Sequence, residues 1–356
     1  MTAFPKADFQ DLRSGSELMS APGRKQSSVN SQYACWRISE GEERRFPIST
    51  QSVATMISFT AIVVAWSLTP RSAIAQTWVT DSVCPDDTPT VFHGCAMEAA
   101  KTFDPPRAPD GRPDMGGIWH FPDEKLGGAY EDLEEHPSSD EDEGGPSVII
   151  DPPDGKVPMQ AWADARRKEH PQRYIHHNAA CFLSGVPETM YMTETYQFLQ
   201  APENFIILSE DTHAYRSIPL DGRPHVGENI RLWNGDSRGR WEGNTLVIDT
   251  MNQNGKPWLD QRGRFYTEEA HVVERLTLID SNTIHYQATV DDPNVYMSPF
   301  TIVFPYRRST TEGYEMLAEA CYENNKAFLD VYRSVGYGIY PGISVEEAQE
   351  AMKAEQ

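Results

Sequence analysis

The sequence predicts a mainly β protein built on an antiparallel up-and-down barrel of the lipocalin or calycin type, with short N- and C-terminal helices. Seven or eight strand-like segments follow one another with short turns between them. No helix alternates with these segments, so a doubly wound α/β fold is disfavoured. Glycine-rich phosphate loops and the G-x-S-x-G nucleophile motif are absent from the sequence. Barrel closure would remove exposed sheet edges, and a β-sandwich is the alternative.

The strands are expected mainly as hairpins, because β-favouring runs flank turn residues. The expected strands span 196–200, 205–210, 212–218, 239–241, 245–249, 272–279, 283–290 and 300–306.

Three helices are expected around these strands. A short one at 157–170 is followed by Pro171, which should end it. Two more are expected at 322–332 and 345–353, and Ser344 with Glu347 forms a capping box for the last one.

The N-terminal residues have the features of a secretory signal. Arg44 and Arg45 precede an apolar stretch at 53–68, and Ala73 and Ala75 supply a small-x-small cleavage site. An uncleaved anchor is the alternative. We therefore expect a periplasmic or secreted protein with no stable membrane span after cleavage. Its expected parts are an extension and signal at 1–75, a proline-rich leader at 76–121, an acidic loop at 122–147, and a barrel domain with C-terminal helices at 148–356.

The charge of the chain limits its partners. A formal net charge of −22 argues against nucleic acid and against anionic membrane surfaces. The expected partner is a small-molecule substrate or ligand. Residues 122–147 hold ten acidic side chains and one lysine, which predicts a solvated loop. A calcium site is the alternative, although the regular ligand spacing of a calcium loop is missing.

The cysteines indicate disulfides. Four of them follow the expected cleavage site, and an even number in an oxidising compartment suggests two bridges. Three pairings are possible. We favour Cys84 with Cys95, which closes a short loop, and Cys181 with Cys321, which ties the middle of the chain to its C-terminal part. The spacings match no common zinc motif.

Several segments resemble one large family of secreted bacterial proteins. The most distinctive are 220–225 (LDGRPH) and 233–247 (WNGDSRGRWEGNTLV), and further ones lie at 105–114, 181–187, 271–275 and 321–324. The resemblance spans about 104–325 and implies secretion and a single domain. The family has no established activity, so the resemblance implies no reaction. The acidic segment looks longer here than the family pattern.

Histidine is the side chain best suited to proton transfer near neutral pH. In an extended 212–218 strand, His213, Tyr215 and Ser217 would share one face and could project into the barrel. We expect His213 as the base and Tyr215 as an acid or oxyanion donor, with Glu210, His271 and Arg216 as supporting groups. An ordinary solvated strand face is the alternative.

His271 is expected to point inward with Val273, while Glu274 would pair outside the barrel with Arg275 or Arg216; the opposite assignment stays open. His225 follows a turn and could line the barrel mouth. If His213, His225 and His271 converged, they could hold a metal, but no known motif spacing supports this. The adjacent His176 and His177 would point apart in a strand. We therefore expect no metal site and no cofactor.

Aromatic side chains around the strands could bind a flat apolar ligand. The expected substrate-binding residues are His225, Trp233, Tyr286, Phe205 and Tyr196.

Together these residues favour an exported, cofactor-independent lyase or isomerase. It would act by His, Tyr and Glu acid–base chemistry on a small, partly apolar molecule of aromatic, terpenoid or steroid-like type. A non-catalytic periplasmic binding protein and a metal-dependent secreted hydrolase are the alternatives.

Overall fold

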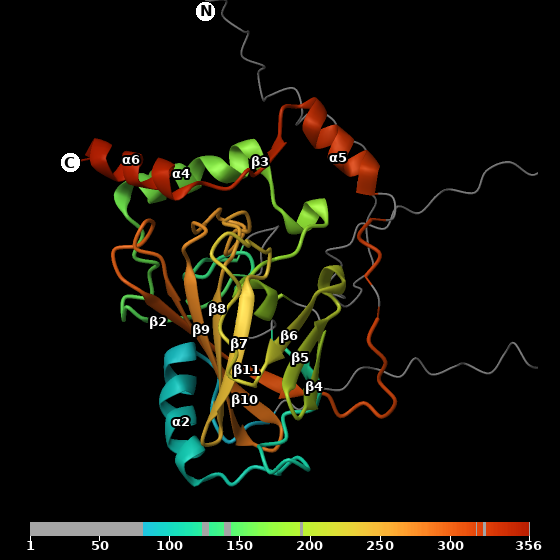
Figure 1. Cartoon of the computed structure of the whole chain (residues 1–356). Helices are drawn as coiled ribbons and strands as arrows, with labels where there is room; N and C mark the ends of the chain where they lie inside the picture. Colours follow the sequence, from blue (N-terminus) through green and yellow to red (C-terminus); the bar gives the residue numbers. More distant parts are fainter. Residues whose placement is uncertain are drawn as a thin grey trace, which may run out of the picture. The chain divides into compact units, whose positions relative to one another are not determined.

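Ten strands form one antiparallel sheet, and nine of them follow one another in a nearly closed barrel (Figure 1). The computed structural model describes residues 81–122, 128–138, 144–192, 195–317, 319–322 and 325–355. They belong to one compact unit, Ser72–Gln356. The expectations for residues 1–75 lie outside the described residues.

The barrel follows the order β6-β5-β4-β1-β11-β10-β9-β8-β7, and β2 also pairs with β11. The strands of the sheet are β1 (Gly117–His120), β2 (Ile149–Asp151), β4 (Thr195–Ala201), β5 (Asn204–Ser209), β6 (Tyr215–Pro219), β7 (Asp236–Glu242), β8 (Thr245–Met251), β9 (His271–Asp280), β10 (Thr283–Asp291) and β11 (Phe300–Arg308). The predicted mainly β barrel is thus confirmed, and every predicted strand contributes to it.

The helices lie outside the sheet. They are α2 (Pro89–Thr102), α4 (Ala161–Arg173), α5 (Asn325–Ser334) and α6 (Val345–Glu355). Three single turns of 3-10 helix, η2 (Asn178–Ala180), η3 (Glu188–Met190) and η4 (Asp211–His213), precede or follow strands. A parallel pair of two-residue strands, β3 (Tyr174–Ile175) and β12 (Gly338–Ile339), ties the C-terminal part to the end of α4.

Helix α2 was not expected from the sequence. The Thr88 side chain caps it by accepting a hydrogen bond from the Val91 amide, and Pro89 occupies its first turn. Its Phe92 and Ala96 pack on Ile279 of β9 and Val303 of β11, outside the barrel. The expected leader is therefore part of the domain, because it supplies α2 and also strand β1.

Two helix boundaries test the sequence rules directly. Helix α4 continues through Pro171 instead of ending before it. The capping box of α6 is confirmed, since the Ser344 amide donates to Glu347 Oε2 at 3.1 Å and the Glu347 amide donates to Ser344 Oγ at 3.2 Å.

Aromatic rings fill the barrel interior. Tyr286 stacks on Phe304 with ring centroids 4.5 Å apart, and Tyr306 contacts Tyr196, Phe198 and Phe304 edge-on at 5.3–5.7 Å. All five side chains are fully buried. These rings therefore form a packed core in the position where the sequence predicted a ligand cavity.

The barrel closes between β6 and β7 through side chains. Arg216 on β6 donates to Ser237 Oγ on β7 at 3.1 Å. Gly239 lets the two strands approach, because a Cβ built there would lie 2.5 Å from Leu220 Cδ2 and 2.9 Å from Ile218 Cγ2.

The acidic segment is more ordered than a solvated loop. In its described part, Ala129 and Leu133 are fully buried in the core. Asp132 and Glu134 bind the buried guanidinium of Arg264 at 2.6 and 2.9 Å, and Asp260 binds the same group at 2.5 Å. The prediction of a solvated loop is therefore wrong for residues 128–138, since two of its carboxylates neutralise a buried cation.

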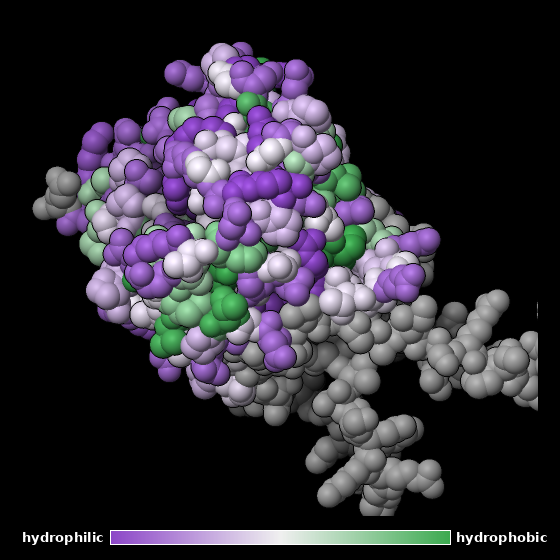
Figure 2. All heavy atoms as spheres, turned by 90° about the horizontal axis from the view of Figure 1, so that it is seen from below, coloured by the Kyte–Doolittle hydropathy of each residue, from purple (hydrophilic) through white to green (hydrophobic). Residues whose placement is uncertain are grey.

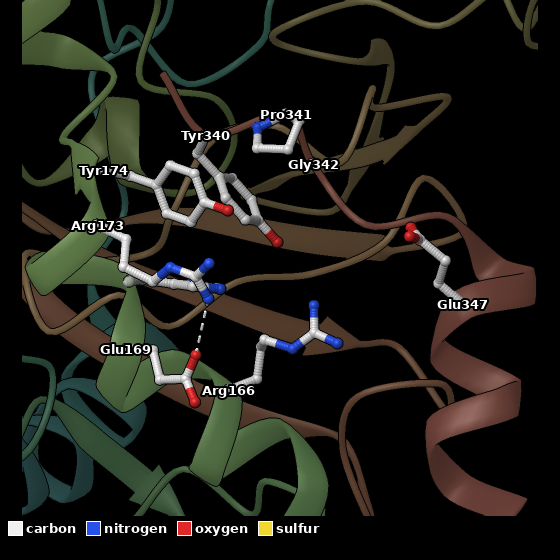
Figure 3. A pocket seen from close by; sticks show the side chains of 9 residues that line it. Arg166, Glu169, Arg173, Tyr174, Tyr340, Pro341, Gly342 and Glu347 are labelled. Atoms are coloured by element: carbon white, nitrogen blue, oxygen red, sulfur yellow. Dashed lines mark hydrogen bonds and ion pairs between the residues drawn. The ribbon is translucent and has the colours of Figure 1, made fainter. Parts of the chain in front are cut away.

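At one end of the barrel, α4 and α6 lie beside each other and, with β3 and β12, enclose a pocket of about 150 Å³ (Figures 1 and 3). On the face seen from below, the surface of the described residues is mainly hydrophilic, with small hydrophobic patches between the hydrophilic residues (Figure 2). Within the described ranges, no helix is long and apolar enough to cross a bilayer.

Candidate metal centre

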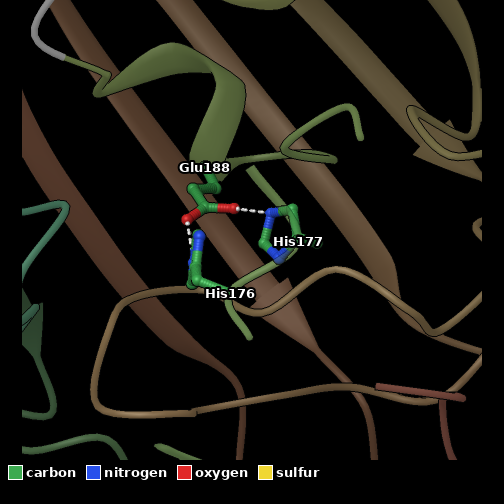
Figure 4. Close-up of side chains that lie close together, drawn as sticks. All are labelled: His176, His177 and Glu188. Carbon is green, nitrogen blue, oxygen red and sulfur yellow. Dashed lines mark ion pairs between the residues drawn. The ribbon is translucent and has the colours of Figure 1, made fainter. Parts of the chain in front are cut away.

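Three side chains converge at the base of the loop that follows β3. His176 and His177 come directly after that strand, and Glu188 opens η3, which follows Pro187. His176 Nε2 lies 3.1 Å from Glu188 Oε1, and His177 Nε2 lies 2.7 Å from Glu188 Oε2 (Figure 4). The two imidazole rings lie 4.1 Å apart, centroid to centroid. We call this set the His176–His177–Glu188 cluster.

The local backbone explains why adjacent histidines face one carboxylate. An extended strand would direct them to opposite sides. His177 instead has helical dihedrals, φ −60° and ψ −39°, at the start of η2. The strand geometry that the sequence analysis assumed for this pair is therefore wrong.

The four polar atoms of the cluster are close but not aligned for hydrogen bonding. Among the described residues, the buried Nε2 atoms of both histidines and both carboxylate oxygens of Glu188 have no well-oriented hydrogen-bond partner. One donor atom from each side chain can be chosen so that all lie within 4.8 Å of one another. Two imidazole nitrogens and a carboxylate gathered in this way are the side-chain types that a cation site uses.

Burial controls the protonation of the cluster. The Glu188 side chain is fully buried, and those of His177 and His176 expose 2% and 10% of their surface. Burial lowers the pKa of His177 to about 3 and also lowers the pKa of His176. Burial raises the pKa of Glu188 to about 7; nearby His176 opposes this shift, while Asp211 and Asp260 add to it.

Further carboxylates surround the cluster. Asp211 accepts hydrogen bonds from Asn178 at 2.6 Å and Ser184 at 3.1 Å, both neutral donors. Burial raises its pKa to about 6. Arg264 neutralises Asp260. Glu188 and Asp211 have no comparable lysine or arginine partner in the described part of the chain.

Two aromatic side chains lie next to the His177 side of the cluster. The rings of Phe182 and Trp233 stack in parallel, with centroids 4.9 Å apart and planes inclined by 6°. The Trp233 ring lies 6.5 Å from that of His177. Phe182 is partly exposed, so this pair presents an aromatic surface beside the histidines. Trp233 was predicted to bind substrate, and that role stays a prediction.

The structure does not form the predicted His213 and Tyr215 face. His213 belongs to η4, not to a strand, and its side chain lies outside the described structure. Tyr215 is 70% exposed, whereas Arg216 is buried. The prediction that Tyr215 points into the barrel is therefore wrong. Tyr215 points outward, and the next residue, Arg216, points inward.

Arg216 points inward because Glu274 on β9 pairs with it there. Its two terminal nitrogens donate to the two Glu274 oxygens at 2.9 and 2.5 Å. Tyr286 Oη donates to Glu274 Oε1 at 2.9 Å. The predicted Arg216–Glu274 pair thus exists, but inside the barrel and not outside it.

His271 and His225 lie on the outer face of the sheet. They share Asp249 of β8: His225 Nε2 lies 2.9 Å from Oδ1, and His271 Nε2 lies 3.1 Å from Oδ2. The inward direction predicted for His271 is therefore wrong, and the alternative, with Glu274 inward, is right. Asp236 also contacts His225 Nδ1, at 3.0 Å.

The remaining predicted site residues contact other parts of the fold. Glu210 accepts hydrogen bonds from the Tyr314 hydroxyl at 2.9 Å and the Thr195 amide at 3.4 Å. Tyr196, Phe205 and Tyr286 are fully buried.

Both predicted disulfides are confirmed: Cys84 is bonded to Cys95 and Cys181 to Cys321.

Sequence reasoning missed Glu188, although a signal was present. This carboxylate stands in the run Val186-Pro187-Glu188-Thr189-Met190-Tyr191, which is otherwise mostly apolar. A charged residue in such a run is buried only with a partner or a metal ion. Its position near His176 depends on the path of two loops, which spacing along the chain does not reveal.

Comparisons with known proteins add little. No protein-family model matches the chain, and no curated protein matches it. Among solved structures, one that matches is described as a REP1-NXSQ fatty acid transporter, at 15% identity with a TM-score of 0.20; the match covers 33% of this chain and 70% of that one. So low a score supports no argument about fold or function.

Proposed function

We propose that this protein is an exported metal-dependent hydrolase, with a divalent transition metal held by His176, His177 and Glu188. The observation that carries the proposal is the convergence of two imidazole nitrogens and one carboxylate, none of which has an aligned hydrogen bond in the described structure. Two histidines and one acidic residue, with a position left for water, form a recurrent catalytic zinc arrangement.

The spacing within the cluster can be compared with the spacing of ligands around a metal ion. Zinc binds nitrogen and oxygen at about 2.0–2.2 Å, so neighbouring ligands of a tetrahedral ion lie about 3.3 Å apart. One nitrogen of each histidine and one Glu188 oxygen lie within 4.8 Å of one another, so these side chains would have to draw closer together to reach this spacing around an ion. The nearby Asp211 adds a second buried carboxylate, so a cation would relieve uncompensated negative charge.

Metal binding requires one change in the hydrogen bonds of His177. The Trp258 amide donates to His177 Nδ1 at 3.2 Å, whereas a metal on Nε2 leaves the ring proton on Nδ1. The backbone carbonyl of Ser184 can accept a hydrogen bond from the protonated ring. We expect the metal-bound state to exchange the Trp258 contact for the Ser184 contact, which would orient the ligand.

The metal would lower the pKa of a bound water and so supply a nucleophile near neutral pH. The stacked Phe182 and Trp233 would hold an aromatic or otherwise flat part of a small substrate beside it. The two disulfides support export to an oxidising compartment.

The test is metal content in protein recovered from a periplasm. We expect about one zinc, manganese or cobalt ion per chain, and a visible cobalt spectrum that reports tetrahedral nitrogen and oxygen ligands. Glu188→Gln keeps the side-chain volume and should lose most of the metal, whereas the matched control His271→Gln, on the outer face, should retain it.

Hydrolysis of small aryl esters is the activity readout. It should disappear on chelation and return with metal, and Trp233→Ala should raise KM more than it lowers kcat. If the wild-type chain binds no metal after reconstitution, the metal proposal fails. The cofactor-independent proton-transfer chemistry favoured by the sequence would then be the one to pursue.

A further inference from the structure

The pocket beside α4 combines a buried aromatic wall with charged side chains at its solvent-exposed rim. Its lining comes from the last turns of α4, from β3, from the segment after β12 and from α6 (Figure 3). These elements are far apart in the sequence, and the β3–β12 pairing holds them together. Its volume of about 150 Å³ is below the ~300–1,000 Å³ of pockets for drug-sized ligands, so it suits a smaller molecule.

A buried hydroxyl without a partner points into this pocket. Tyr340 is 5% exposed, and its Oη has no hydrogen-bond partner among the described residues. Figure 3 shows this oxygen directed toward the side where Arg166 and Arg173 lie. Buried polar groups in folded proteins almost always have partners, so this hydroxyl is available to hydrogen-bond a molecule that enters the pocket.

Of the two arginine side chains that line the pocket, one is in an ion pair and the other is not. Arg173 is paired with Glu169 at 3.1 Å. Arg166 has no carboxylate within 4 Å in the described part of the chain. Glu347, on the far wall, caps α6 by accepting the Ser344 amide. Among the described residues, the pocket thus offers one guanidinium that is in no ion pair, and Glu347 would repel a second negative charge on a ligand.

The walls of the pocket are aromatic. The rings of Tyr174 and Tyr340 lie 5.4 Å apart and nearly perpendicular, and the His170 ring lies 4.6 Å from that of Tyr340. Burial lowers the pKa of His170 to about 4, and its Nδ1 lies 3.0 Å from the Gly263 carbonyl. His170 therefore lines the pocket as a neutral imidazole near neutral pH and adds no charge to it.

We infer that this pocket binds the carboxylate of a small, partly aromatic monoanion. The ligand carboxylate would accept hydrogen bonds from Arg166 and from the Tyr340 hydroxyl, while its apolar part would pack on the two tyrosine rings. A single carboxylate matches the one available guanidinium, whereas a phosphate dianion would be repelled by Glu347. The site is independent of the proposed metal.

The experiment is calorimetric titration of the whole exported chain with benzoate, acetate and inorganic phosphate, with and without chelator. Saturable benzoate binding, stronger than acetate and phosphate binding and insensitive to chelator, is the expected result. Arg166→Gln should weaken benzoate about tenfold or more, because it removes a charge-assisted contact. Tyr340→Phe, which keeps the ring, should weaken it severalfold.

Lys168→Gln is the matched control. It removes the same charge from the same helix, but Lys168 is paired with Asp164 away from the pocket, so benzoate affinity should stay within about twofold. The inference is wrong if wild-type protein shows no saturable benzoate binding, if phosphate binds more tightly than benzoate, or if Arg166→Gln and Tyr340→Phe bind benzoate like the control. None of these outcomes depends on whether the His176–His177–Glu188 cluster holds a metal.

Discussion

At the scale of single residues, the most consequential interaction is the ion pair inside the barrel. Arg216 and Glu274 are buried, and Ser237, Thr250 and Tyr286 add further hydrogen bonds to the pair. A pattern of alternating residues predicts two faces of β6 but not which face is inside. A charged side chain is usually placed on the solvent face, so the pair was predicted outside the barrel. That prediction was wrong because Arg216 is paired with a carboxylate on β9, a strand distant in sequence.

Breaking this pair should strongly destabilise the protein. Arg216→Met leaves Glu274 buried without its cation, so the free energy of unfolding should fall by about 3–5 kcal/mol. The double variant Arg216→Met/Glu274→Leu should be more stable than either single variant, because no lone charge remains. Urea unfolding measures this. Arg240→Met, which removes a solvent-exposed pair with Glu242 on β7, should cost less than about 1 kcal/mol. A double variant that loses the sum of both single effects would contradict the argument.

The outer His271 gives a pH dependence of known sign. The hydrogen bond with Asp249 raises the pKa of His271, and the same contact lowers the pKa of Asp249. The stabilisation from charged His271 is complete below its unfolded pKa of about 6.5 and is lost as pH rises through its higher folded pKa. The stabilisation from ionised Asp249 is lost only in acid, at pH values below the unfolded pKa of an aspartate, about 4.

We therefore expect the stability difference between wild type and His271→Gln to shrink from pH 5.5 to pH 8.5. Urea midpoints at the two pH values measure it. Using the difference removes the contribution of buried histidines such as His285, whose lowered pKa acts with the opposite sign. A difference that stays constant, or that grows with pH, would show that the Asp249 contact does not favour the charged imidazole.

At the scale of elements, the hairpins were predictable, whereas the short strands β1 and β2 were not. The pairs β4–β5, β7–β8 and β9–β10 carry their turn residues and alternation within about twenty residues, so local sequence determines them. Strand β1 has four residues and pairs with β4 and β11, both far along the chain. Nothing within 117–120 specifies those partners.

The β6–β7 seam can be tested through its glycine. Gly239→Ala would push against Leu220 and Ile218, so it should destabilise the protein by about 1–3 kcal/mol. Gly94→Ala is the matched control: it lies within α2 with open space around it, and it should stabilise by about 0.5–1 kcal/mol. Thermal unfolding of both variants measures the contrast. Equal effects of the same sign would mean that Gly239 is not needed for closure.

At the scale of the whole molecule, the two disulfides should contribute unequally. Cys84–Cys95 closes a separation of 11 residues and Cys181–Cys321 one of 140. In the loop-entropy treatment, these lengths correspond to about 3 and about 5 kcal/mol. Replacing each pair by alanines and measuring urea unfolding should give the larger loss for Cys181→Ala/Cys321→Ala. A larger loss for Cys84→Ala/Cys95→Ala would refute this order. Both losses are measured relative to the oxidised wild type, which has both bridges.

The position of β1 also has a consequence for the order in which the chain can assemble. Ribosomes release residue 117 long before residue 308, yet β1 is the strand that joins the β4–β6 meander to β11. A sheet of β1 and β4–β6 that lacks β11 would have unpaired backbone groups along its β1 edge, and such edges attract other chains. Contacts between segments so distant in sequence also form slowly. We therefore expect closure of the barrel to come late in folding, and we expect the sheet without β11 to be the form that most needs protection from aggregation.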